Sequence, residues 1–455
     1  MVWGQVNCSN RMQPNENDCL DGLDLLHSFQ LLSSLKEPGA SLSQIASDVN
    51  HNHIQGIPPI RPHSISSFFI SNNRISGEIP TSIYELWNIR ILDLADNNLT
   101  GVLPPCLGNL SSTQGALSLS GNNFAGKIPE FNSVKCELDT IDLSSNSFEG
   151  PLPRSFSSCR KLKYVNFGSN KIMDGFPSWL GSLPSLKVHM LHSNRLYGEI
   201  KPPGNESMFP SLKVITLSYN LFWGKLPADY FPHWLAVKYF SPGDAQCPDA
   251  YVQIVKMTII DKGVEREFGK TTGYFTLLDL SSNNFSGTIV ESIGDNLLKL
   301  HTLNLSNNDL TGLIPQSLAN LRNLEVFYLS QNRLGKIPGT LKHMTSLAHF
   351  NVSYNNLSGT IPGENQFGTF ENTSYIGNPG LCGAPLTKRC GKNSPQFTLC
   401  SGHDQEGLPF GFMWITTLAG LMGGFSRRSG VGAGIRCCCF VLVCEELAEV
   451  WERTA

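Results

Sequence analysis

Residues 303–315 read LNLSNNDLTGLIP, and similar phrases occupy residues 92–104 (LDLADNNLTGVLP) and 352–362 (VSYNNLSGTIP). Their common pattern is L-x-L-x-x-N-x-L-x-G-x-I-P. Its asparagine returns every 23 to 26 residues along most of the chain, and we call these residues the ladder asparagines. They are Asn73, Asn97, Asn122, Asn146, Asn170, Asn194, Asn220, Asn283, Asn308, Asn332 and Asn355. A fixed period of this length predicts a solenoid, an architecture that usually presents a binding surface.

The pattern explains how one repeat makes one coil. Leu92 and Leu94 have strand spacing, so both side chains point to the same face, and a single repeat cannot bury them without a stacked neighbour. An asparagine side chain can donate and accept hydrogen bonds at once, which suits it to link the turns of successive coils. The glycine permits an unusual backbone angle and the proline prevents a long helix.

One interval is anomalous and divides the repeats. Asn220 and Asn283 are 63 residues apart, which is one repeat of 24 plus 39 extra residues. We expect these extra residues to leave the stack as an island that folds over one face. The predicted segments are 1–50 (atypical), 51–235 (repeats), 236–272 (island), 273–363 (repeats), 364–392 (cap), 393–407 (juxtamembrane), 408–425 (membrane helix) and 426–455 (cytoplasmic tail).

The repeats resemble those of plant leucine-rich-repeat receptor-like proteins, which are cell-surface receptors without a kinase domain. The phrase L-S-G-x-I-P is the plant extracellular form, and Lys262, Gly263 and Glu265 match the island of that family. The resemblance implies an α/β solenoid. In this fold, parallel strands form a concave face and 3-10 helices and loops form a convex face. It also implies an island, a C-terminal cap and one transmembrane helix.

Two features of the ends bear on this resemblance. SYIGNPGLCGAPLTKRC, at residues 374–390, is similar to the family's cap, and Cys382 with Cys390 is its predicted disulfide. Residues 1–10 contain no apolar stretch long enough for a signal peptide, and relatives usually carry more repeats, so the chain resembles an N-terminally shortened member.

Other cysteines and the sequons concern the compartment. Cys136 and Cys159 lie at similar places in adjacent coils, so they either approach within bonding distance or remain buried thiols. The sequons fit an extracellular chain, although an Asn- and Ser-rich repeat also creates them by chance. They begin at Asn7, Asn98, Asn109, Asn205, Asn284, Asn304, Asn351, Asn356 and Asn372.

The segment 408–425 carries no charge over 18 residues, which is the lower limit for a membrane-spanning helix. Arg427 and Arg428 follow it, so the positive-inside rule places the tail in the cytoplasm and the repeats outside, as in a single-pass type I plasma-membrane protein. An apolar tail without structure is the alternative. Only 30 residues follow Phe425, too few for a kinase domain, so the resemblance implies an adaptor receptor kinase and a co-receptor kinase as partners.

Composition and motifs exclude several functions. The net charge is −3 with no basic stripe, which argues against nucleic acid as a partner. No catalytic constellation, metal-ligand spacing or nucleotide loop is present, so we expect no enzyme activity, no cofactor and no metal.

We expect a peptide, protein or glycan ligand to bind outward-facing residues of the concave sheet, where tyrosines and charged side chains are typical of recognition. The candidates are Lys163, Tyr164, Asn166, Lys187, His192, Lys213, Tyr219, Tyr328, Gln331, His349 and Tyr354. The resulting hypothesis is a receptor in pathogen perception. The alternatives are a secreted inhibitor of an extracellular enzyme, a developmental receptor and a nonfunctional receptor fragment.

Overall fold

The computed structural model divides the chain into residues 1–392 and 393–455, and the second unit lies entirely outside the described residues. So do the predicted membrane segment 408–425, sequons Asn7, Asn109 and Asn205, and most of residues 1–64. The structure describes residues 45–48, 65–80, 83, 89–105, 107–108, 115–131, 136–202, 209–239, 258–261, 264–267, 275–363 and 365–390.

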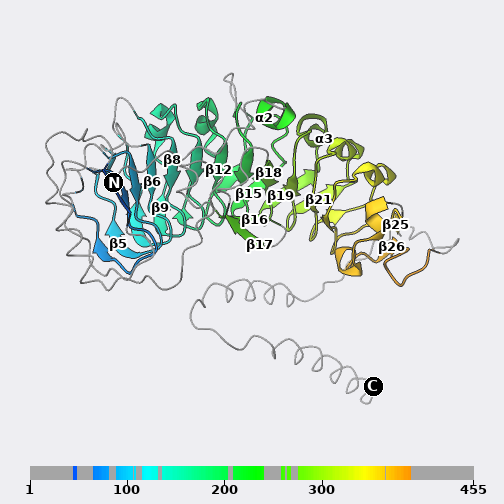
Figure 1. The fold of residues 1–455 in the computed structure, drawn as a ribbon. Coiled ribbons are helices and arrows are strands. Elements are labelled where there is room, and N and C mark those ends of the chain that lie inside the picture. The colour runs from blue at the N-terminus through cyan, green and yellow to red at the C-terminus, as the bar shows by residue number, and fades with distance from the viewer. Residues whose placement is uncertain are drawn as a thin grey trace, which may run out of the picture. The chain divides into compact units, whose positions relative to one another are not determined.

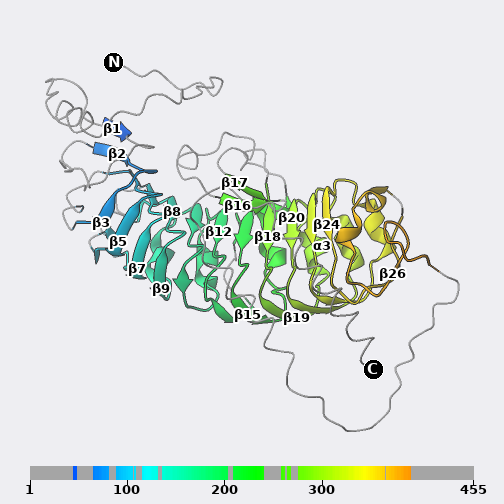
Figure 2. The same ribbon diagram turned by 90° about the horizontal axis from the view of Figure 1, so that it is seen from below.

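A sheet of twelve strands, each hydrogen-bonded in parallel to its neighbours, runs along one side of the repeats (Figures 1 and 2). In order they are β1 (Ile45–Asp48), β2 (Ile65–Phe69), β4 (Ile91–Asp93), β6 (Ala116–Ser118), β8 (Thr140–Asp142), β10 (Tyr164–Asn166), β12 (Val188–Met190), β14 (Val214–Thr216), β18 (Leu277–Asp279), β20 (Thr302–Asn304), β22 (Val326–Tyr328) and β24 (His349–Asn351). Each strand from β4 onward lies at the L-x-L phrase, which confirms the predicted parallel solenoid of leucine-rich repeats.

Two further parallel sheets of five strands lie at the return segments and form a separate row in Figure 2. The first contains β3 (Ser76–Glu78), β5 (Asn98–Val102), β7 (Asn123–Lys127), β9 (Ser147–Gly150) and β11 (Lys171–Ile172). The second contains β13 (Tyr197–Glu199), β15 (Leu221–Gly224), β19 (Asn284–Thr288), β21 (Asp309–Gly312) and β23 (Arg333–Leu334). The repeat glycine in these strands has positive φ, for example 85° at Gly101 and 77° at Gly312.

Short helical segments connect the two rows of strands and lie along the upper edge in Figure 1. Four of them directly follow a proline, which fixes the backbone angle before the turn begins: η3 (Arg154–Ser158), η4 (Ser178–Ser182), η8 (Gln316–Asn320) and η9 (Gly339–His343). Others are η5 (Phe231–His233), α2 (Leu235–Lys238), α3 (Ser292–Asn296), η10 (Asn365–Gly368) and η11 (Asn372–Ser374).

The ladder asparagines connect coil to coil through their side chains. Nδ2 of Asn97 donates to Ile70 O of the preceding coil at 3.0 Å, and to Leu94 O and Ala95 O of its own turn at 3.2 and 3.0 Å. Its Oδ1 accepts from Ile75 N at 3.0 Å. The same contacts recur down the stack, so a buried turn has its polar groups satisfied without water.

The ladder has a further rung that the repeat pattern did not identify. Oδ1 of Asn378 accepts from Leu357 N at 3.0 Å, and its Nδ2 donates to Val352 O at 2.9 Å. Ser374 O and Ile376 O accept from Val352 N and Tyr354 N, both at 2.8 Å. These residues continue the hydrogen bonding beyond β24, and β25 (Ser358–Thr360) pairs with β26 (Gly380–Cys382) beside them.

The island does not interrupt the stack. β14 and β18 pair in register, with Val214 opposite Leu277, although the segment between them is the longest connection in the chain. Within the island the structure describes the backbone of an antiparallel pair, β16 (Thr258–Asp261) and β17 (Val264–Glu267). Residues 236–238 lie in α2, and Val237 is buried in the core of the repeats.

Candidate functional site

The candidate site is the outward face of the twelve-stranded sheet. In each three-residue strand the middle side chain, such as Val165 or Ile215, enters the core, so the first and third side chains point away from it. The residue just before each strand borders the same face. Three rows of side chains therefore cross the strands, and each row takes one residue from every coil.

Lysines occupy the first row in three consecutive coils. Lys187 N donates to Lys163 O, and Lys213 N donates to Lys187 O, both at 2.8 Å. Neighbouring lysine backbones are therefore about one strand spacing apart, roughly 4.8 Å. Asp139 precedes them, and its Oδ2 lies 4.0 Å from Lys163 Nζ. We call Lys163, Lys187 and Lys213 the lysine column.

An apolar cluster lies beside the lysine column in the second and third rows. It consists of Tyr164, Val188, Met190, Val214 and Leu277, all at most 3% exposed, with Phe275 packed against it. These residues are separate from the main core, because they stand on the opposite face of the strands. The centre of the candidate site is consequently apolar.

Carboxylates and amides occupy the third row on either side of Met190. Asp142 accepts hydrogen bonds from Ser144 N at 2.9 Å, Ser144 Oγ at 2.7 Å and Asn166 Nδ2 at 3.2 Å. Burial raises the pKa of Asp142 from 3.8 to about 6, against the lowering effect of these hydrogen bonds. Burial likewise raises the pKa of Asp93 to about 6 and that of Asp279 above its usual value.

The predicted ligand residues fall into two groups. Lys163, Tyr164, Asn166, Lys187 and Lys213 lie together on β10 to β14 or at their entry. His192 lies beyond β12, where its Nδ1 is 3.2 Å from Thr216 Oγ1 and burial lowers its pKa. Tyr328 and His349 are half-buried on β22 and β24. Since β14 and β22 are three strands apart, roughly 14 Å separates the groups.

Three predicted residues stand at the turn instead of on the strands. Tyr219, Gln331 and Tyr354 each precede a ladder asparagine and have φ of 54°, 55° and 53°. Tyr219 is 60% exposed and Tyr354 is 55% exposed. The structure therefore places their side chains at the rim of the sheet face.

The apolar cluster is the part of the site that our sequence reasoning missed. Attention to tyrosines and charges passed over Val188, Met190 and Val214, although they occupy outward positions of the L-x-L phrase. Apolar residues at both outward positions, as in Val188-His189-Met190, were the available signal.

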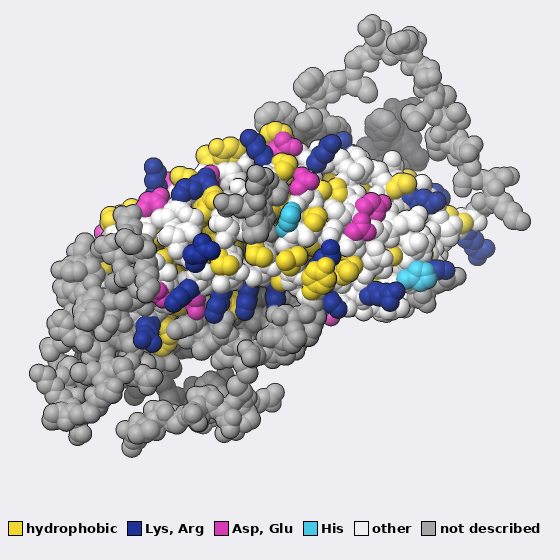
Figure 3. Space-filling model, turned by 90° about the horizontal axis from the view of Figure 1, so that it is seen from above, with side chains coloured by type: hydrophobic (Ala, Val, Ile, Leu, Met, Phe, Trp, Pro, Cys, Tyr) yellow, Lys and Arg dark blue, Asp and Glu magenta, His cyan; other side chains and the backbone are white. Residues whose placement is uncertain are grey.

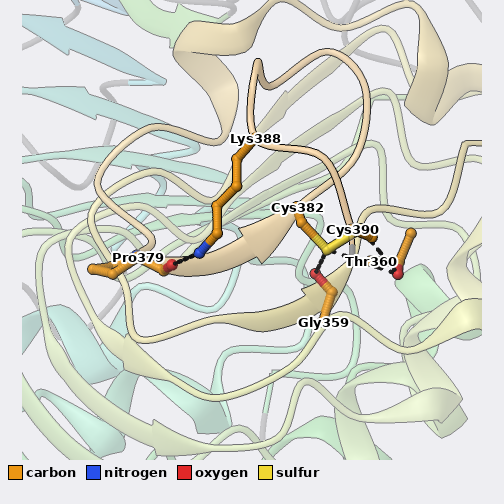
Figure 4. The surroundings of a disulfide bond; sticks show 6 residues. All are labelled: Gly359, Thr360, Pro379, Cys382, Lys388 and Cys390. Atoms are coloured by element: carbon orange, nitrogen blue, oxygen red, sulfur yellow. Dashed lines mark hydrogen bonds between the residues drawn. A yellow bond between two sulfur atoms is a disulfide. The ribbon is translucent and has the colours of Figure 1, made fainter. Parts of the chain in front are cut away.

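Two disulfides lie within the described residues. Cys136 and Cys159 are joined with Cα atoms 4.7 Å apart, which links adjacent coils. Cys382 and Cys390 are joined with Cα atoms 5.1 Å apart (Figure 4). Thr360 Oγ1 donates to Cys390 Sγ at 3.4 Å, which ties this loop to β25.

The described sequons occupy two different environments. Asn98, Asn284, Asn356 and Asn372 are exposed. Asn304 and Asn351 lie half-buried on the twelve-stranded sheet. Nδ2 of Asn304 donates to Ser281 Oγ at 3.1 Å, so its amide is engaged in the polar row.

Charge and metal sites give little further guidance. Lys and Arg side chains recur along the face seen from above (Figure 3). Across the described segments, His, Cys, Asp and Glu form no group of three or more that could hold a metal ion. No helix in the described part of the chain has both the length and the apolar character that a membrane span needs.

Comparisons with known proteins agree with the fold. Models of the leucine-rich repeat match residues 64–86, 88–110, 137–159, 274–334 and 298–357. Among solved structures, a plant ice-binding protein is 28% identical with a TM-score of 0.49, covering 67% of this chain and 85% of that one. The plant peptide hormone receptor RGFR1 in complex with RGF2 is 22% identical with a TM-score of 0.49, covering 74% and 54%.

Curated relatives come from Arabidopsis thaliana. Receptor-like protein 35 is 37% identical over 246 residues, which is 52% of this chain and 25% of that protein. Receptor-like protein 34 is 40% identical over 357 residues, covering 63% and 36%. The chain thus spans between a quarter and about a third of the length of these relatives. Its repeats and these relatives together show that the chain belongs to the plant leucine-rich-repeat receptor-like proteins.

Proposed function

We propose that the chain is a ligand-binding receptor-like protein of the plant cell surface that acts in pathogen perception and signals through a partner receptor kinase. The observation that carries the proposal is the contiguous face on β10 to β18. There the lysine column borders the apolar cluster, and buried carboxylates and amides complete the surface. The chain binds its ligand on this face and does not convert it.

The arrangement indicates the chemistry of the ligand. An apolar centre supplies the area that drives association, and the lysine column at its border favours a negatively charged group. A peptide or protein that carries an acidic residue beside apolar side chains meets both requirements.

A charge-neutralising variant tests the role of this face. Lys163, Lys187 and Lys213 are replaced together by Gln, and the matched control replaces Lys127, Lys171 and Lys225, which are exposed on the five-stranded sheets. Both chains, supplied with a secretion signal, are expressed in leaf and challenged with pathogen culture filtrates. We expect the first variant to lose at least tenfold in sensitivity while the control responds like the parent. Equal responses from both variants would exclude the lysine column from the ligand site.

The surface location has its own test. The chain tagged at Ala455 is expressed in leaf without an added signal and treated with an endoglycosidase. A mass decrease of several glycans supports entry into the secretory pathway. An unchanged mass contradicts the proposed location for the chain as written.

A further inference from the structure

The second five-stranded sheet carries exposed apolar side chains on its outer face. Tyr197 on β13 is 52% exposed, and Leu221 and Trp223 on β15 are 59% and 52% exposed. Met173, just beyond β11, is 52% exposed in the preceding coil. Clustered exposed apolar residues usually mark a surface that another group covers.

The strand register identifies a chemical group beside this patch. Tyr197 lies opposite Leu221, and Trp223 lies opposite Asn284 on β19. Directly opposed residues in neighbouring strands have Cβ atoms about 5 Å apart on the same face. Asn284 is exposed and begins the sequon Asn284-Phe285-Ser286.

We propose that Asn284 carries an N-linked glycan and that its first sugar packs on the indole ring of Trp223, so that the chain's own glycan covers this patch. The C–H face of a sugar ring is apolar and matches the face of an exposed indole, while its hydroxyls remain in water. The inference rests on the proposed extracellular function, because the modification takes place only in the secretory lumen.

The attachment chemistry is balanced by a lipid-linked oligosaccharide diphosphate as the donor. The bond between sugar C1 and the diphosphate oxygen breaks, and a bond from Asn284 Nδ2 to C1 forms. The amide gives up one proton, which leaves with the released diphosphate.

Two other sequons provide an internal comparison. Asn98 and Asn356 also directly follow a ladder asparagine and are exposed. Asn98 lies opposite Ser76. Asn356 N donates to Leu334 O at 3.1 Å, which places Asn356 beside Gly335. Of these three equivalent sites, Asn284 has an aromatic neighbour, whereas the other two face a small residue.

The experiment measures how fast each glycan is released from the folded protein. The full chain is secreted from plant cells with an added signal peptide, incubated with an amidase that cleaves N-glycans, and sampled for peptide mass spectrometry. We expect the Asn284 glycan to be released about three- to tenfold more slowly than those at Asn98 and Asn356, the range that one aromatic contact supports.

Three variants connect the protection to the ring. In Trp223→Ser the release at Asn284 is expected to reach the rate at Asn98, whereas Trp223→Phe keeps part of the protection. Met173→Ser removes another exposed apolar side chain of the patch, two coils from Asn284, and should leave the rate unchanged. Since all three positions are on the surface, the variants are expected to fold.

Each remaining outcome has a defined meaning. Equal release rates at the three sites, or protection that survives in Trp223→Ser, would overturn the inference. An unmodified Asn284 with modified Asn98 and Asn356 would also overturn it and leave the proposed function intact. If all three sites were unmodified despite the added signal, both the inference and the extracellular function would be wrong.

Discussion

At the scale of single residues, His189 occupies the place of a repeat leucine in the middle of β12. It is completely buried, its ring lies 6.0 Å from Phe209 and 6.4 Å from Phe176, and neither ring nitrogen has a hydrogen-bond partner among the described residues. Burying an unsatisfied polar group costs about 1–3 kcal/mol. We therefore expect His189→Leu to raise the free energy of unfolding by about 1–2 kcal/mol in urea titrations. Exposed His343→Leu serves as the control, and a loss of stability in His189→Leu would contradict the assignment.

Burial also makes His189 sensitive to pH. Its pKa falls from 6.5 to about 3 in the folded state. The unfolded chain thus binds this proton first, so His189 weakens the fold progressively as pH decreases below about 6.5. We expect the advantage of His189→Leu over the parent to grow between pH 7 and pH 5 in the same titrations. An advantage that stays constant with pH would show that the folded protein accommodates the charged ring.

Asp142 acts in the opposite direction. Its folded pKa of about 6 exceeds the usual 3.8, so the folded state takes up this proton first and gains stability as pH falls from about 7 to 4. Two units correspond to about 3 kcal/mol. We expect Asp142→Asn, compared with the parent, to be more stable at pH 7.5 and to lose that advantage near pH 4. The variant-minus-parent difference isolates this contribution from that of His189, and a flat difference would contradict it.

At the scale of the repeated element, the ladder asparagine supports two coils at once. Asn194 accepts from Ile172 N at 3.0 Å and donates to Phe167 O at 2.9 Å, so Asn194→Ala leaves buried groups of the preceding coil without partners. We expect a loss of about 2–4 kcal/mol. Hydrogen exchange should accelerate first in β10 to β14, because repeats depend on their nearest neighbours. Exposed Asn123→Ala is the control, and equal exchange in both variants would contradict a special role for the ladder.

The same element shows what sequence could and could not predict. The L-x-L spacing and the asparagine define the strands of the twelve-stranded sheet, because side-chain periodicity and turn chemistry are local. The five-stranded sheets were missed, because L-x-G-x-I has no strand pattern of its own and pairs only when coils stack. Asn378 was missed for a related reason, since Pro379 replaces the usual polar residue after it. The apolar cluster depends on which outward residues become neighbours, which a single repeat does not show.

At the scale of the whole described unit, the register between β14 and β18 separates the island from the stack. Leu277 N donates to Lys213 O at 2.9 Å, as in coils without an insertion. We expect a chain in which residues 240–274 are replaced by a Gly-Ser linker of about ten residues to keep its far-UV circular dichroism. It should also keep slow hydrogen exchange in β14 and β18. Fast exchange confined to these two strands would show that the island is needed to hold the two halves together.

The hydrogen bonds beyond β24 also affect how the protein behaves in a crowded solution. A stack of parallel strands ends in a row of unused backbone donors, which is a template for edge-to-edge polymerisation. Val352 N and Tyr354 N would belong to that row, but Ser374 O and Ile376 O accept from them. Residues 374–378 thus act as a stopper against fibre growth from this end, a protective role that keeps a protein built from identical-looking layers from adding the layers of another molecule.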